Sequence, residues 1–110
     1  MWRELDEARE CYYAIREIVG RHPDGARDEA ALATLRARCR SEGLSVPDAE
    51  CRAALQAIEE LAAPLFTACE GAGWVRRQLL RELEWYRASL LALESAREQA
   101  ARAGLRPPSP

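Results

Sequence analysis

Four cysteines are the residues of this chain whose types could most readily do chemistry: Cys11, Cys39, Cys51 and Cys69. No two of them form a CxxC pair, which is the spacing of zinc ribbons and thioredoxin-like redox sites. Helical hairpins folded about residues 24 and 44 would bring the first three into one layer, so a thiol-based metal or redox sensor stays open as an alternative. We expect instead that the thiols are small hydrophobic side chains in a reducing compartment, with no bound metal.

Catalytic signatures are missing from the sequence. The single histidine, His22, precedes a proline, and the chain has no Ser/His/Asp set, glycine-rich phosphate loop or HExxH motif. Acidic neighbours such as Glu59 and Glu60 diverge on a helix and do not share a site. The sequence therefore predicts a protein that is not an enzyme and that needs no cofactor.

An arginine cluster lies near the start of the last predicted helix, at Arg76, Arg77 and Arg81. Arginines at a helix N-terminus could bind an anion, because the helix dipole also favours negative charge there. Glu82 and Glu84 follow at once, so ion pairing on the surface is the favoured interpretation. An anion site remains open.

The elements that would position these residues are four helices, and no strand is predicted. Apolar residues recur at helical spacing over residues 2–21, 27–42, 46–70 and 74–103, and Gly- or Pro-containing stretches separate these segments. Short connections favour neighbouring helices that run in opposite directions. We therefore predict an all-α, single-domain antiparallel four-helix bundle over residues 1–103, with a long C-terminal helix. Residues 104–110, GLRPPSP, are expected to form a disordered Pro-rich tail.

The stretch SEGLSVPDAE, residues 41–50, could be the turn of a DNA-binding helix-turn-helix or the corner of a bundle. Gly43 is suited to close one helix, with Leu44 as the accompanying hydrophobic contact, while Ser45 and Asp48 resemble a capping box. The helix that follows has a single base, Arg52, among several acidic residues, so DNA phosphates would repel it. The corner is the favoured interpretation, and a dimeric helix-turn-helix-like transcriptional regulator is the alternative.

The composition of the chain limits the kinds of partner that it can bind. The chain of 110 residues is 48% hydrophobic and has a net charge of −2, which argues against nucleic acid or an acidic membrane as a partner. Its first residues lack the pattern of a signal peptide, and its longest uncharged stretch, residues 61–69, is too short to cross a bilayer. A cytoplasmic protein is expected.

The last predicted helix is apolar over more of its circumference than one core requires. Its main stripe is Val75, Leu79, Leu83, Tyr86, Leu90 and Leu93. Leu80 and Leu91 lie to one side of this stripe, and Trp74 and Trp85 lie to the other. Trp2 and Tyr13, also eleven residues apart, repeat the feature in the first helix. The last helix could be central, with the aromatic side chains covering the sides of the bundle, or it could present a second interface.

We predict the second interface, and hence a non-enzymatic helical protein–protein interaction module: an adaptor, a chaperone-like protein or an assembly factor. The predicted partner-binding residues are Trp2, Tyr13, Trp74, Leu80, Trp85, Leu90, Leu91 and Leu93. Because the last helix is longer than its neighbours, residues from Leu90 onward, including Leu93, are expected to project and to be exposed in a monomer. A homodimer formed through this helix would cover them.

Overall fold

Four helices make up most of the chain that the computed structural model describes, which is residues 3–23, 26–46, 48–67 and 72–104. They are α1 (Arg3–Arg21), α2 (Glu29–Ser45), α3 (Ala49–Phe66) and α4 (Ala72–Arg102). Within those ranges there is no strand, and the one β-bridge joins Arg27 to Thr67. The all-α prediction is confirmed, while Trp2, Cys69 and the predicted tail from residue 105 onward lie outside the described residues.

Each helix turns its predicted apolar stripe towards the others. On α1 the buried side chains follow one another at spacings of three and four residues, as helical periodicity requires; they are Leu5, Ala8, Cys11, Tyr12, Ile15 and Val19. On α4 the buried stripe is Val75, Leu79, Leu83, Tyr86 and Leu90. The core therefore forms from the stripes that the sequence predicts.

The corner between α2 and α3 differs from the prediction. Gly43 does not close α2, because the helix continues to Ser45 and the side chain of Leu44 is 91% exposed. The helix ends at Val46, whose extended backbone is what a following proline favours. Asp48 is the N-cap of α3, and its carboxylate accepts a hydrogen bond of 3.2 Å from the amide of Cys51.

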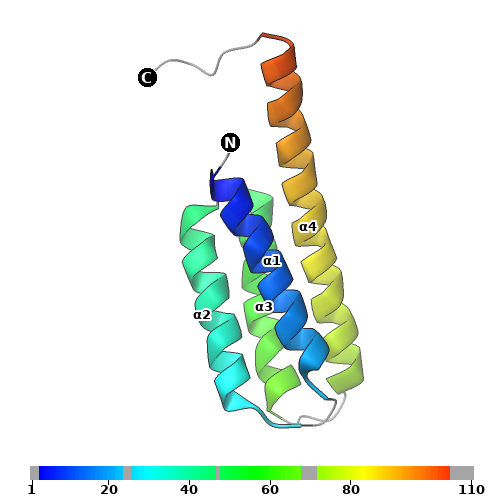
Figure 1. Ribbon diagram of the computed structural model, residues 1–110. Helices are drawn as coiled ribbons and strands as arrows, with labels where there is room; N and C mark the ends of the chain where they lie inside the picture. Colours follow the sequence, from blue (N-terminus) through cyan, green and yellow to red (C-terminus); the bar gives the residue numbers. More distant parts are fainter. Residues whose placement is uncertain (1–2, 24–25, 47, 68–71, 105–110) are drawn as a thin grey trace.

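Helix α4 packs against α3 and α1, and α2 packs against α1 and α3 (Figure 1). Hydrogen bonds and ion pairs between α1 and α4 fix how these two helices lie together. Near the end of α1, Arg76 contacts the carbonyl of Val19, and near its beginning Arg97 contacts Glu4 at 2.6 Å. The last turns of α4 extend beyond the other three helices (Figure 1).

The prediction that α4 projects from Leu90 onward is wrong for Leu90 and holds only in part for Leu93. Leu90 is 7% exposed and belongs to the core, and Leu93 packs against that core with its side chain partly buried. The first turns of α1 cover this part of α4, and ion pairs of Arg9 with Glu94 and of Arg97 with Glu4 hold them together. The part of α4 that projects therefore begins later and is rich in alanine.

No helix within the described ranges combines the length and the apolar character that crossing a membrane would need.

Candidate functional site

The side of α4 that faces away from the core presents two tryptophans. Trp74 is 61% exposed and Trp85 is 46% exposed. Eleven residues are about three helical turns, so both indoles lie on the same side of α4, roughly 16 Å apart along its axis. We call the surface between them the α4 outer face, and it consists of Trp74, Arg77, Leu80, Arg81, Glu84 and Trp85.

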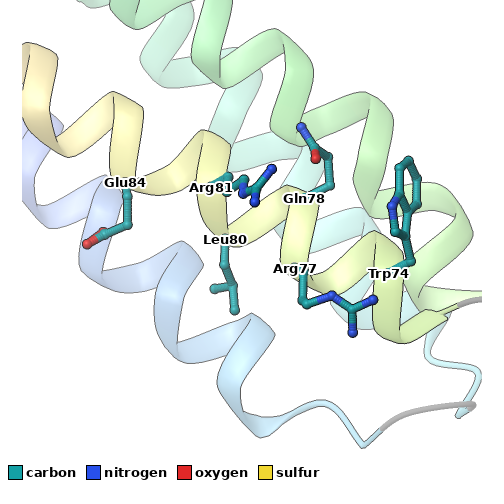
Figure 2. Close-up of a pocket in the computed structure, with 6 residues that line it drawn as sticks. All are labelled: Trp74, Arg77, Gln78, Leu80, Arg81 and Glu84. Carbon is teal, nitrogen blue, oxygen red and sulfur yellow. The ribbon is translucent and has the colours of Figure 1, made fainter.

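An open hollow of about 490 Å³ lies along the first half of the α4 outer face. Its lining residues are Trp74, Arg77, Gln78, Leu80, Arg81 and Glu84. In Figure 2, Leu80 and Glu84 extend on the side of α4 towards α1, whereas Trp74 and Gln78 extend on the opposite side. Apolar and charged groups therefore alternate on this surface.

The polar groups of the α4 outer face differ in whether they already have partners. The carboxylate of Glu84 accepts a hydrogen bond of 2.8 Å from the Tyr12 hydroxyl on α1, and burial together with this bond raises the pKa of Tyr12. Arg77 and Arg81 make no hydrogen bond or ion pair with any described residue. The two guanidinium groups are therefore available to a partner, while the carboxylate one turn beyond Arg81 already accepts a hydrogen bond from Tyr12.

The third arginine of the predicted cluster has a different role. Arg76 turns towards α1 and donates hydrogen bonds to the carbonyl oxygens of Val19, at 2.6 Å, and of His22. These carbonyls belong to the C-terminal end of α1, where a cation also complements the helix dipole. His22 is buried, and its Nε2 donates to the carbonyl of Leu65 at 3.1 Å. Arg76 thus stabilises the end of α1, and the predicted cluster of three arginines is divided between two sides of α4.

A second, smaller hollow of about 90 Å³ lies between α1 and α4. Tyr13 and Leu91 meet there, and both are about half exposed. The hydrogen bond between Tyr12 and Glu84 lies between this hollow and the α4 outer face, since each residue lines one of them. The structure thus brings together three of the predicted partner-binding residues from two helices, Tyr13 of α1 and Leu90 and Leu91 of α4.

The predicted partner-binding residues fall into three groups. Exposed ones are Tyr13, Trp74, Leu80, Trp85 and Leu91. Leu90 is buried and Leu93 partly buried, so neither offers the free surface that was expected, and Trp2 lies outside the described residues. The sequence analysis missed Arg77 and Arg81 as members of the same surface. Their positions relative to Trp74 and Trp85, at spacings of three, four and four residues, are the signal that could have found them.

The cysteines of the described chain are buried and free, namely Cys11, Cys39 and Cys51. Burial raises the pKa of Cys11 to about 11 and the pKa values of Cys39 and Cys51 to about 12. Cys11 and Cys39 interact electrostatically, and all three thiols influence the buried hydroxyl of Tyr86, whose pKa is raised above its usual range chiefly by burial. The thiols therefore remain protonated at neutral pH.

Metal-ligating side chains do not gather elsewhere in the described ranges either, where no three His, Cys, Asp or Glu residues are placed to hold an ion. At the α2–α3 corner, Arg52 donates to the carbonyl of Val46 at 2.9 Å, and the first turn of α3 exposes Glu50. The base that could have met a DNA phosphate is thus occupied within the corner.

Comparisons of the chain with protein-family models, with curated proteins and with solved structures find no match.

Proposed function

We propose that this protein is a non-enzymatic helical interaction module, an adaptor, chaperone-like protein or assembly factor, whose partner binds the α4 outer face. The observation that supports this function is the pair of exposed indoles, Trp74 and Trp85, on one side of a helix. Arg77 and Arg81 lie between them along the helix and pair with none of the residues that the structure describes. Tryptophan and arginine are the residues most enriched among those that dominate binding energy at protein interfaces. Large exposed indoles that no other helix covers have no role in the core.

The scaffold that we propose for this surface is an antiparallel four-helix bundle. Three contacts between α1 and α4 support it, because higher residue numbers in one helix pair with lower numbers in the other: Val19 with Arg76, Tyr12 with Glu84, and Glu4 with Arg97. Free buried thiols are compatible with a reducing compartment, and we place the protein in the cytoplasm on that basis.

Site-specific photo-crosslinking in cells of the native host tests the proposed function. A photoreactive phenylalanine analogue replaces Trp85 in one variant and Leu44 in the other, which is an equally apolar and more exposed side chain on α2. We expect discrete crosslinked products from position 85 and none of these products from position 44. An absence of products from position 85, or the same products from both positions, would show that the α4 outer face has no dedicated partner.

A further inference from the structure

The charges on the α4 outer face indicate which kind of partner it binds. Arg77 and Arg81 are unpaired within the described chain, while Glu84 is held by Tyr12. The protein as a whole has a net charge of −2, so this surface differs in sign from the average of the molecule. Opposite charge across an interface speeds encounter and excludes wrong partners, which favours carboxylates on the partner.

Apolar anchors flank these charges. Trp74 and Trp85 lie at the two ends of the surface, and Leu80 lies beside the hollow between them. An indole offers a large, rigid contact area at a small cost in conformational entropy. A partner that fills this surface must therefore be apolar along one stripe and acidic beside it.

The spacing of the two arginines favours a helix as the partner. Arg77 and Arg81 are four residues apart on α4, which is about 6 Å along the helix axis. Carboxylates at positions i and i+4 of a neighbouring helix repeat at the same distance, so each can meet one guanidinium. The roughly 16 Å between the tryptophans corresponds to about three turns of such a helix.

A second copy of this chain fits the same surface less well. Two-fold pairing centred on the α4 outer face would place the arginines of one copy near those of the other, and like charges at an interface oppose association. Each copy would also contribute Glu84, but that carboxylate is already bonded to Tyr12.

We infer that the α4 outer face binds an acidic amphipathic helix of another protein, with its apolar stripe on Trp74 and Trp85 and its carboxylates on Arg77 and Arg81. This inference rests on the proposed function, which requires only that some partner binds there.

Peptide display tests the inference. Random 16-residue peptides (a length of about four turns) are selected on the intact protein and counter-selected on the double variant Trp74→Ala/Trp85→Ala. We expect the enriched peptides to combine leucine or aromatic residues at helical spacing with Asp or Glu at i and i+4. Binding of a synthetic peptide with an enriched sequence should weaken by roughly tenfold or more in Arg77→Glu/Arg81→Glu. Replacing the acidic residues of the peptide with lysine should restore its binding to that variant.

The matched control is Arg3→Glu/Arg102→Glu, which changes the net charge by the same amount at exposed positions outside this surface. It should leave the affinity for the peptide within about twofold, because remote exposed charges are screened.

Three results would overturn the inference. Enriched peptides that are neutral or basic, yet lose binding in the tryptophan variant, would refute the acidic partner and leave the proposed function intact. A selection that yields no tryptophan-dependent peptide would also overturn it, and the crosslinking from position 85 would then decide the proposed function separately. Sedimentation of the unmodified protein as a dimer that Trp85→Ala dissociates would identify a second copy as the occupant.

Discussion

The hydroxyl of Tyr86, buried in α4, donates a hydrogen bond of 3.0 Å to the carbonyl oxygen of Ala8 in α1. The bond crosses the core between residues that are 78 positions apart in the sequence. It also places the phenol beside Cys11, whose thiol influences its pKa. A buried polar group requires such a partner, because leaving it unpaired in the core is costly.

Replacing Tyr86 with phenylalanine should therefore lower the free energy of unfolding by about 1 kcal/mol, since the ring still fills its site and only the hydrogen bond is lost. Tyr86→Leu should cost about 3 kcal/mol, because it also leaves a cavity. Urea titration followed by circular dichroism measures both values. A Tyr86→Phe variant as stable as the original protein would mean that the bond contributes nothing net.

Arg76 and Arg77 are neighbours in sequence, but we expect their substitution to change the free energy of unfolding by different amounts. Arg76→Met keeps the apolar stem but removes the guanidinium that holds the carbonyls of Val19 and His22, so we expect a loss of about 2 kcal/mol in unfolding free energy. Arg77→Met is the matched control, and it should change stability by less than about 0.5 kcal/mol because its side chain is exposed and pairs with none of the described residues. Equal effects of the two substitutions on the urea midpoint would contradict the assignment of Arg76 to the end of α1.

Leu90 and Leu91 provide a second matched pair. Leu90→Glu should destabilise the fold by about 3 kcal/mol or more, because it places a carboxylate in the core. Leu91→Glu, at a position that is 48% exposed, should cost less than about 0.5 kcal/mol. Thermal unfolding with sedimentation at the same concentration measures stability and association together. If Leu90→Glu leaves the thermal midpoint unchanged but dissociates a dimer, then Leu90 is an interface residue and its place in the core is wrong.

Glu42 gives the stability a dependence on pH. Its side chain is buried near the end of α2, one carboxylate oxygen has no hydrogen-bond partner among the described residues, and burial raises its pKa. The nearby carboxylate of Glu7 on α1 raises the pKa further, and Arg38 lowers it. The folded state therefore retains this proton at a pH where the unfolded chain releases it. The stabilisation from the protonated carboxyl is complete below the unfolded pKa and is lost as the pH rises from there through the folded pKa.

We therefore expect Glu42→Gln to be more stable than the original protein at neutral pH. The difference should shrink as the pH falls through the raised folded pKa towards the ordinary glutamate pKa, and it should stay constant below that. Urea midpoints measured across this pH range test the prediction. Glu60→Gln, which removes an exposed carboxylate from α3, is the control and should show no such trend. A Glu42→Gln advantage that grows towards acidic pH would contradict the sign.

The thiols of Cys11, Cys39 and Cys51 should be unreactive in the native protein. With a pKa of about 11 for Cys11 and about 12 for the other two, only about one thiol in a thousand or fewer is ionised near pH 8. In a Cys69→Ser variant, which leaves these three as the only cysteines, a chromogenic disulfide reagent should count no thiols before unfolding and all three in guanidinium chloride. Rapid reaction of native protein would instead revive the thiol-sensor alternative.

The helices and the residues that they bury follow from local chemistry, and the sequence by itself determined them. The stripe of α1 from Leu5 to Val19 has the helical period, which fixes the face that must leave water whatever it packs against. The local chemistry also predicted a helix start at this corner, although the cap is Asp48, whose carboxylate accepts a bond from the amide of Cys51, and not Ser45, which lies within α2. The exposure of Trp74 and Trp85 could likewise be predicted, since both lie off the apolar stripe of α4.

Only the tertiary structure decided the features that depend on where a neighbouring helix begins or ends. Leu90 is buried because the first turns of α1 reach that far along α4. The apolar pattern of α4 does not say how far α1 extends beside it. Arg76 separates from Arg77 because the end of α1 offers free carbonyls on one side of α4 and solvent lies on the other. Glu84 likewise accepts a hydrogen bond because Tyr12 of α1 lies opposite it. Helical periodicity fixes the direction in which each side chain points around its own helix axis. The partner that a charged side chain meets depends instead on how two packed helices are shifted along each other.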